Sequence, residues 1–199
     1  MYKNFIKRLL DVIGALILSP FILILIVILA PFYFFLDRGP LFYNAKRLGK
    51  NGIPFKMFKF RSMIVNAPDI RLEDGSTYNG EDDPRVTKLG HFLRKTSIDE
   101  LPQIFNVLIG NMSFIGPRPD TLDSWERYTE TDKTSLWVKP GITGYNQAYF
   151  RNSIDAKEKL KNDVYYAHHV SLKIDIMIFF KTIKSVLWQE NINITSNHK

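Results

Sequence analysis

The hydrophobic and polar positions divide the chain into one long apolar segment and a mixed remainder. No charged residue occurs from Val12 to Leu36, and most positions there are Ile, Leu, Val or Phe. A helix in a soluble core is seldom apolar on every face for this length, so the run predicts a membrane helix. Its length and the lack of a following small-residue cleavage site argue against a secretory signal peptide.

Whether this segment crosses the membrane depends on Pro20 and on the flanking charges. Pro20 has no backbone N–H, so the carbonyl of Leu16 loses its helical partner at a cost of roughly 3 kcal/mol. The hydroxyl of Ser19 can bond a freed carbonyl and commonly accompanies a bend. Basic flanks tend to stay in the cytoplasm, and both flanks are basic: Lys3, Lys7 and Arg8 before the segment, then Arg38, Lys46, Arg47 and Lys50 after it. Two structures stay open: a plain transmembrane helix, and a helix broken at Ser19-Pro20 that enters and returns on one face.

Beyond Asp37 the pattern is that of a soluble domain that begins with a β-hairpin. Two strands are predicted over Leu41–Arg47 and Ile53–Met63. Between them lies Gly49–Gly52, whose residue types favour a hairpin turn. The stretch 66–83 is polar, acidic and rich in turn residues, which predicts a surface loop that could cover a site.

The rest of the chain is predominantly helical by its apolar spacing. Ser97–Glu100 fits the S-x-x-E capping box that begins a helix, and helical apolar spacing follows it. Amphipathic helices are predicted over Leu122–Trp137, Ser153–His169 and Leu172–Trp188. The last is rich in Ile and Phe, which favours contact with a membrane interface over the alternative of a core helix. Lys139–Gly144 is a glycine-rich loop without the lysine-serine pairing of a P-loop. Helices together with a short hairpin indicate an α+β fold.

Composition narrows the class of protein. With 199 residues, of which 45% are hydrophobic, the chain can bury one good core. It contains no cysteine, which excludes disulfides and thiolate metal sites. The net charge of +7 favours anionic partners, namely phosphates, nucleic acid or an acidic membrane surface, and by itself selects none of them.

The strongest candidate for chemistry is the adjacent pair Asp99 and Glu100, which lies between Arg94 and Arg118 in the chain. An ionised carboxylate beside cations can attack phosphorus, as in enzymes that form an aspartyl phosphate. Adjacent helical residues point about 100° apart, so the two cannot easily share a proton. Separate roles fit better, one residue attacking and the other holding a hard cation such as Mg²⁺. Ordinary helix capping by two acidic residues is the alternative.

Basic residues on either side of this pair can bind phosphate. Lys56, Lys59 and Arg61 alternate with aromatic residues in the second strand, a pattern that can serve nucleic acid but more often marks a strand with one face in the core. Arg118 stands between two prolines that fix the backbone around it, which suits bidentate phosphate recognition, although the four residues G-P-R-P more often form a simple turn.

Five stretches in a fixed order carry a family resemblance. They are LLDVIGALILSP, GPLFYNAKRLGKNGIPFKMFKFRSM, DPRVTKLGHFLRKTSIDELPQIFNVLIGNMSFIGPRP, KPGITG and DVYY. With them, the chain from about Phe5 to Trp188 closely resembles the bacterial sugar transferases, specifically the small monotopic polyprenol-phosphate phosphoglycosyl transferases. The central stretch, around Asp99, is the most specific.

The resemblance implies a reaction between a UDP-sugar and a polyprenol phosphate such as undecaprenyl phosphate, which begins glycoconjugate assembly and releases UMP. It makes Asp99 the nucleophile that carries a covalent phosphosugar, and Glu100 the ligand of Mg²⁺. By position, basic and acidic residues match further active-site positions of the family: Lys59, Arg61, Arg94, Arg118, Arg151 and Asp163. No nucleic acid is expected as a partner, and a homo-oligomer is left open.

The resemblance also favours the re-entrant helix, broken at Ser19 and Pro20, over a transmembrane helix. The chain is then monotopic, with residues 1–37 in the membrane and residues 38–199 as an interfacial catalytic domain on the cytoplasmic face of the bacterial inner membrane.

Some residues depart from the family pattern, and two other functions compete. Asn111 and His91 replace an acidic and a basic residue, and Gly144–Arg151 differs from the common sequence, so this loop and the 66–83 loop are the candidates for sugar choice. One rival function is a conventional glycosyltransferase that releases UDP. The other is a non-enzymatic basic membrane adaptor.

Overall fold

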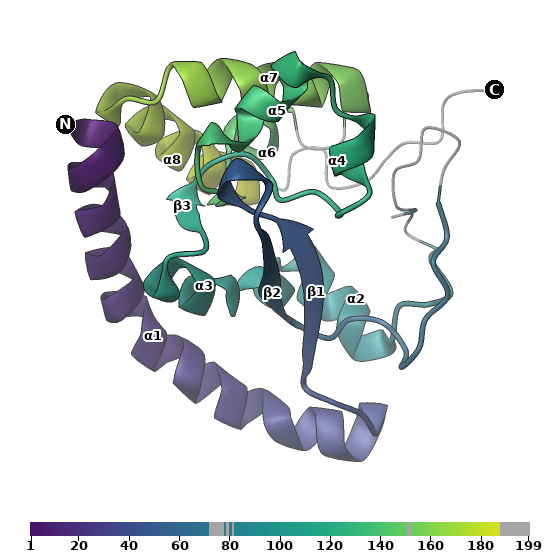
Figure 1. The fold of residues 1–199 in the computed structure, drawn as a ribbon. Helices are drawn as coiled ribbons and strands as arrows, with labels where there is room; N and C mark the ends of the chain where they lie inside the picture. The colour runs from purple at the N-terminus through teal and green to yellow at the C-terminus, as the bar shows by residue number, and fades with distance from the viewer. Residues whose placement is uncertain (72–77, 79, 81, 151–152, 188–199) are drawn as a thin grey trace.

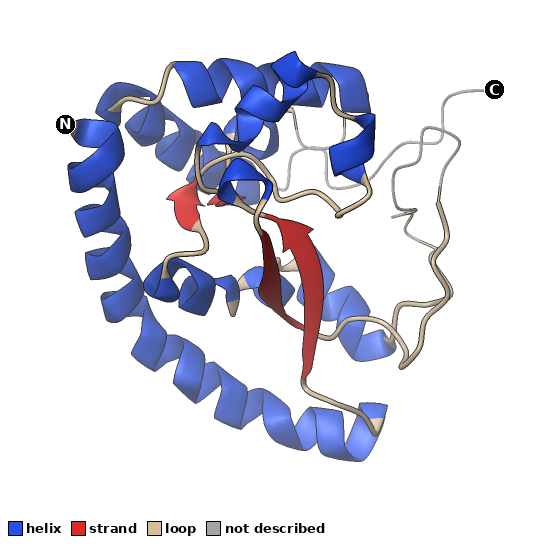
Figure 2. Cartoon of the chain, in the orientation of Figure 1, coloured by secondary structure: helices blue, strands red, loops and turns tan. Residues whose placement is uncertain are grey.

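A computed structural model of the chain describes residues 1–71, 78, 80, 82–150 and 153–187. Helices dominate, and two small sheets of two strands each lie among them (Figure 2). The predicted α+β class is therefore confirmed.

The N-terminal element is one long helix, α1 (Lys7–Phe32), which π-helical turns extend at both ends. It remains helical through Ser19 and Pro20, so no break in helical structure occurs where one was predicted. The Ser19 hydroxyl donates to the carbonyl of Leu16 at 3.1 Å, which replaces the bond that Pro20 cannot make. Figure 1 shows that α1 changes direction near its middle and curves around the rest of the molecule. The helix bends without breaking.

One narrow stripe of α1 packs against the domain, while its other faces are exposed. The exposed apolar side chains include Phe21, which is 64% exposed, and Val27, which is 72% exposed. Within the described residues this is the one helix long and apolar enough to cross a membrane. The stripe consists of buried residues along the whole helix and its final turn: Asp11, Ala15, Ile22, Leu29 and Tyr33.

The predicted hairpin is confirmed, with ends shifted by one to three residues. β1 (Phe42–Leu48) pairs antiparallel with β2 (Pro54–Phe60) through a short 3₁₀ turn, Lys50–Gly52, in which Asn51 takes the left-handed conformation. The edge of β2 is covered by α3 (Gln103–Ile109). There the Asn106 side chain accepts from the N–H of Phe58 at 2.8 Å and donates to the carbonyl of Lys56 at 2.7 Å.

The core lies between α1, the hairpin and α3 (Figure 1). Ala15 and Ile22 of α1 meet Phe55 and Met57 of β2, and Ile104 of α3 closes the cluster. The N-terminal end of α1 is held by an ion pair in which the Lys7 ammonium lies 2.5 Å from the Asp175 carboxylate.

The second sheet replaces part of a predicted loop. β3 (Ser113–Ile115) pairs in parallel with β4 (Gly141–Thr143), which lies inside the stretch 139–144. A side chain at Gly116 would lie 2.3 Å from the carbonyl oxygen of Lys139, so the two segments can approach this closely only without one. The tertiary contact makes this glycine-rich stretch a strand.

The helix predicted over Leu122–Trp137 is wrong as a single element. Tyr128 is extended, and Thr129 begins a new helix with a capping box to Asp132, so three short turns replace one helix. The two later predicted helices are confirmed within three residues. The elements are α2 (Lys88–Lys95), α4 (Ser124–Arg127), α5 (Glu130–Lys133), a 3₁₀ turn at Thr134–Trp137, α6 (Tyr145–Tyr149), α7 (Ala156–His168) and α8 (Leu172–Leu187).

Candidate active site

The acidic pair lies in a tight turn between two helices. After α2, Ser97 takes the left-handed conformation at φ 57°, and a single 3₁₀ turn, Ile98–Glu100, leads toward α3. The predicted capping box is therefore wrong. A capping serine needs an extended backbone, and the Ser97 side chain makes no capping bond here. Helix α3 begins only at Gln103, so both carboxylates precede it.

Glu100 is held by two cations from different parts of the chain. Its Oε1 accepts from the Lys59 ammonium of β2 at 2.9 Å and from the Arg118 guanidinium at 2.9 Å. Its Oε2 accepts no hydrogen bond from the part of the chain that the structure describes. One carboxylate oxygen therefore fixes the side chain, and the other is open to a ligand.

Asp99 is in a different environment, although it is the next residue. It is 7% exposed, and Lys59 approaches its Oδ2 at 3.6 Å, an ion pair without a hydrogen bond. Among the described residues none donates a hydrogen bond to this carboxylate. It is thus a buried carboxylate, near positive charge and free of donors that would block an attack.

These environments shift the two acids in opposite directions. Burial raises the pKa of the Asp99 carboxyl and the charge of Glu100 raises it further, against the opposing effect of Lys59. Burial also acts to raise the pKa of Glu100, but Arg118 and Lys59 outweigh it and bring the pKa below its usual range. Glu100 is therefore the firmly ionised member, and Asp99 the more basic one.

The backbone around Arg118 is fixed by the second sheet. The carbonyl of Pro117 accepts from the N–H of Gly141 at 2.8 Å, directly before Arg118. The Arg118 side chain is 54% exposed, so its outer face can meet a substrate. On the other side of the pair, Arg94 of α2 donates to the Ser62 hydroxyl at 2.9 Å and acts to lower the pKa of Asp99.

The structure does not bring every residue expected at the phosphates to this pair. Arg61 is 5% exposed and donates to the carbonyls of Pro40 and Met63, while its own carbonyl accepts from the Tyr33 hydroxyl. It joins the end of the long N-terminal helix to the hairpin. Asp163 lies on α7, where it accepts from Asn146 at 2.9 Å and burial raises its pKa well above its usual range. Arg151 lies outside the described residues.

A divalent cation fits the pair better than a closed metal cage. Within the described residues no group of three or more acidic or histidine side chains could hold a metal. The open Oε2 of Glu100 offers one hard oxygen ligand. Mg²⁺ is commonly bound by one or two carboxylates together with substrate phosphates and water, so a single protein ligand suits it.

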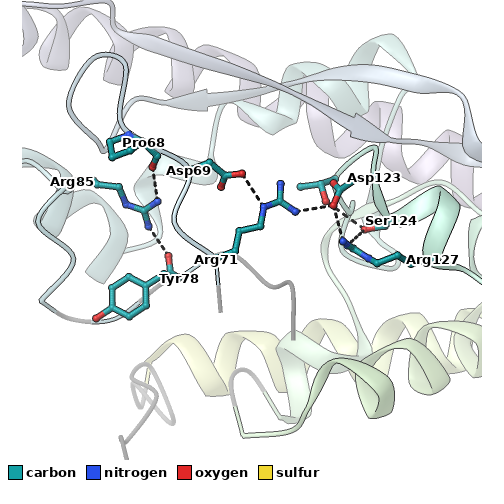
Figure 3. Close-up of polar contacts among 9 residues, drawn as sticks. Pro68, Asp69, Arg71, Tyr78, Arg85, Asp123, Ser124 and Arg127 are labelled. Carbon is teal, nitrogen blue, oxygen red and sulfur yellow. Dashed lines mark hydrogen bonds and ion pairs between the residues drawn. The ribbon is translucent and has the colours of Figure 1, made fainter. Parts of the chain in front are cut away.

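The described part of the 66–83 loop is fastened at two points (Figure 3). Arg85 is buried, pairs with Asp83 at 2.7 Å, and donates to the carbonyls of Pro68 and Tyr78. Arg71 pairs with Asp123, just before α4, also at 2.7 Å. The sequence did not predict these contacts.

Arg47, which the sequence indicates only as one of the basic residues after the apolar segment, also lies near the site. The hairpin register places it on the same face as Tyr43, whose partner across the sheet is Lys59. Side chains alternate between the two faces of a strand, so counting back from the turn at Gly49 would have placed Arg47 on the same face as Tyr43. It adds a cation to the face of the hairpin that carries Lys59.

Comparison with known proteins identifies the family of the chain. The model of the family described as "Bacterial sugar transferase" matches residues 2–189. The chain is 46% identical over 189 residues to "Galactosyl transferase CpsE" of Streptococcus agalactiae, covering 91% of this chain and 42% of the relative. It is 38% identical over 202 residues to "Undecaprenyl-phosphate galactose phosphotransferase" of Salmonella typhimurium, covering 93% and 41%.

The chain thus spans about two-fifths of the length of these two relatives. It spans almost all of another: it is 38% identical over 193 residues to "Uncharacterized sugar transferase EpsL" of Bacillus subtilis, covering 97% of this chain and 92% of the relative. The match to the family model over nearly the whole chain establishes that this protein belongs to the bacterial sugar transferase family.

Proposed function

We propose that the protein is a phosphoglycosyl transferase that moves a phosphosugar from a UDP-sugar to a polyprenol phosphate and releases UMP. The observation that carries the proposal is the difference between the environments of the two adjacent carboxylates. Glu100 is fixed and anionic between two cations, whereas Asp99 is buried, more basic and free of hydrogen-bond donors. The names of two relatives, both phosphotransferases of a sugar with undecaprenyl phosphate, support the same chemistry.

In the proposed first step, an oxygen of Asp99 attacks the phosphorus that bears the sugar. The bond from that phosphorus to the bridging oxygen breaks, its electron pair leaves with UMP, and a covalent aspartyl phosphosugar remains. In the second step, an oxygen of the polyprenol phosphate attacks the same phosphorus and frees Asp99. No proton needs to move in either step, which suits a site built from charges rather than from general acids.

The remaining groups provide charge and alignment. Lys59 and Arg118 hold Glu100 in place and lie beside Asp99, where negative charge gathers in the transition state. Mg²⁺, when bound through Glu100, would neutralise the diphosphate of the donor. The sugar itself stays unassigned.

The membrane helix supports a location at one face of a bilayer. Over Tyr2–Asp37 it has 36 residues, roughly 54 Å at 1.5 Å per residue, against roughly 30 Å of hydrocarbon. Its buried stripe contacts the catalytic domain from Asp11 to Tyr33. A spanning helix would have to pull this charged domain into the bilayer, so we favour a bent, re-entrant helix on the cytoplasmic face of the inner membrane. The exposed apolar residues of α8 would rest on the same surface.

The product nucleotide tests the proposed reaction. Purified protein is incubated with Mg²⁺, undecaprenyl phosphate and a panel of UDP-sugars, and the nucleotide released is separated by chromatography. We expect UMP from at least one donor. Release of UDP would instead establish a conventional glycosyltransferase, and failure of every donor would favour a basic membrane adaptor.

Replacing Pro20 by Ala should straighten α1 and favour a transmembrane orientation. Alanine restores the N–H that bonds Leu16, so the bend loses its cause. The chain has no cysteine, so Asn4→Cys or Lys50→Cys can report each end with an impermeant thiol reagent applied outside intact spheroplasts. We expect both ends to be protected in the parent, and the Asn4→Cys end to become labelled when Pro20→Ala is added.

The matched control is Pro31→Ala, which removes the other proline of α1, in its last turn. This change should leave both ends protected. If Pro20→Ala also leaves both ends protected, the proline does not determine the topology.

A further inference from the structure

Arg47 lies on the face of the hairpin that carries the active site. In the register of the two strands it stands opposite Phe55, and Tyr43 stands opposite Lys59. Residues two apart in a strand share a face, so the side chains of Tyr43, Arg47 and Lys59 are on one side. The neighbouring Lys46 is exposed on the other side.

The end of β1 lies beside the segment that carries Arg118. The N–H of Leu48 donates to the carbonyl of Asp120 at 2.9 Å, which places Arg47 next to the chain that leaves Arg118 and Pro119. Burial lowers the pKa of the Arg47 guanidinium and Arg118 acts in the same direction, against the opposing effects of Tyr43, Asp120 and Asp123. Two like charges are therefore neighbours at the rim of the catalytic pair.

The carboxylates near Arg47 are already engaged by other groups. Asp120 accepts from the Tyr128 hydroxyl, and Asp123 pairs with both Arg71 and Arg127 at 2.7 Å (Figure 3). Arg47 itself makes no hydrogen bond or ion pair with any residue that the structure describes. A half-buried cation without an anion is costly for a folded protein, because it loses water without gaining a partner.

We propose that Arg47 is a substrate-binding residue that, with Arg118, holds the phosphate of the departing nucleotide. This inference rests on the proposed function, since it takes a nucleoside diphosphate sugar as donor. Arginine presents a rigid fork of donors that matches phosphate oxygens, and two adjacent guanidinium groups define a site for an anion.

The position also suits the proposed reaction. Tyr43, the cross-strand partner of Lys59, is four residues from Arg47 along β1, roughly 13 Å at 3.3 Å per residue. Asp99 lies at the Lys59 end, so the phosphorus under attack is there. When the bond from that phosphorus to the bridging oxygen breaks, the electron pair stays on the leaving phosphate. The new negative charge then develops toward Arg118 and Arg47.

Binding of UMP to the full-length protein in detergent, measured by calorimetry, tests this role without requiring turnover. Arg47→Met removes the charge and keeps an unbranched side chain of similar reach. We expect it to weaken UMP binding by about 10-fold to 100-fold, the usual worth of hydrogen bonds to a charged group. The matched control, Lys46→Met, removes the same charge from the opposite face and should change the affinity by no more than roughly twofold. Arg47→Lys should be intermediate, because it restores charge without the fork.

The temperature of thermal unfolding gives a second test, because a structural role for Arg47 predicts a lower unfolding temperature for Arg47→Met and a substrate-binding role does not. Because Arg47 lacks an anion in the protein alone, Arg47→Met should unfold at the same temperature as the parent or higher, while losing most of the stabilisation by added UMP. A lower unfolding temperature without nucleotide, or a failure to fold, would show that Arg47 supports the fold and would overturn the proposal. Unchanged UMP affinity would also overturn it.

These outcomes are separate from those of the proposed function. A parent protein that binds UMP through Arg47 but releases UDP from its donor would reject phosphosugar transfer alone. A parent that releases UMP, with an Arg47→Met variant that binds UMP normally, would reject only the assignment of Arg47.

Discussion

Asp99→Asn is expected to release no UMP and to form no covalent adduct, with turnover reduced by roughly 10⁴-fold or more. The amide has the shape of the carboxylate but lacks its nucleophilic charge, so nothing replaces the attacking oxygen. The direct measurement is intact-protein mass spectrometry after incubation with the UDP-sugar and Mg²⁺, without lipid. The parent should gain the mass of the phosphosugar, mapped by digestion to the peptide that contains Asp99.

Loss of folding would not explain such a result. Burial raises the pKa of Asp99, which means that the folded protein disfavours its ionised form. Removing that charge should therefore leave the unfolding temperature at neutral pH unchanged or slightly higher. The matched control, Glu130→Gln, removes a carboxylate from an exposed position of α5 and should retain the full rate. An Asp99→Asn protein that still gains the adduct would exclude Asp99 as the nucleophile.

The hairpin and the long apolar helix α1 could be predicted from the sequence because local patterns determine them. Alternating residues around the Gly49–Gly52 turn fix the strands to within a few residues. The uncharged run from Val12 to Leu36 has few structures available to it. The expected bond from the Ser19 hydroxyl to the freed carbonyl of Leu16 is confirmed, but the helix continues through Pro20 and does not break there.

The elements that were predicted wrongly depend on contacts between distant segments of the chain. Ser97 has the sequence of a helix cap, but the chain must reverse there to bring Asp99 to Lys59. The loop at Lys139–Gly144 becomes a strand because β3 passes beside it. The end of a helix near Tyr128 could have been predicted in part, because Thr129 and Asp132 have the spacing of a capping box that begins a new helix.

The sequence indicated residues for the candidate site but not the contacts that each of them makes. Of the basic residues that the resemblance selected, Lys59 and Arg118 contact the acidic pair, whereas Arg61 fastens α1 to the hairpin. A charge count cannot separate these roles, because a buried arginine bonded to carbonyls and an arginine facing a ligand have the same sequence signature. Only the engagement of each guanidinium by its neighbours distinguishes them.

Glu100→Gln is the second change with a large expected effect, a loss of roughly 10²-fold to 10³-fold in the rate of UMP release. Glutamine keeps a hydrogen-bonding oxygen for Lys59 or Arg118 but is a poor ligand for Mg²⁺. The measurement is the dependence of UMP release on Mg²⁺ concentration. The parent should lose activity in EDTA, and the variant should require more Mg²⁺ and recover part of its rate when it is supplied.

The acid limb of the stability curve gives an independent check on the same residue. The pKa of Glu100 is lower in the folded protein than in the unfolded chain, so its ion pairs stabilise the fold above the unfolded value of about 4.5 and are lost as the pH falls. Glu100→Gln should therefore be less stable than the parent at neutral pH, and the difference should shrink on acidification below that value.

The two variants together test the proposed roles of Glu100 as metal ligand and Asp99 as nucleophile. With donor but no lipid, Glu100→Gln should still accumulate the adduct slowly, and excess Mg²⁺ should speed it, whereas Asp99→Asn should form none at any Mg²⁺ concentration. The opposite result, an adduct on Glu100 that survives in Asp99→Asn, would exchange the two roles. It would require Glu100, whose charge Lys59 and Arg118 stabilise, to attack through its free Oε2, while the buried and more basic carboxylate of Asp99 took no part.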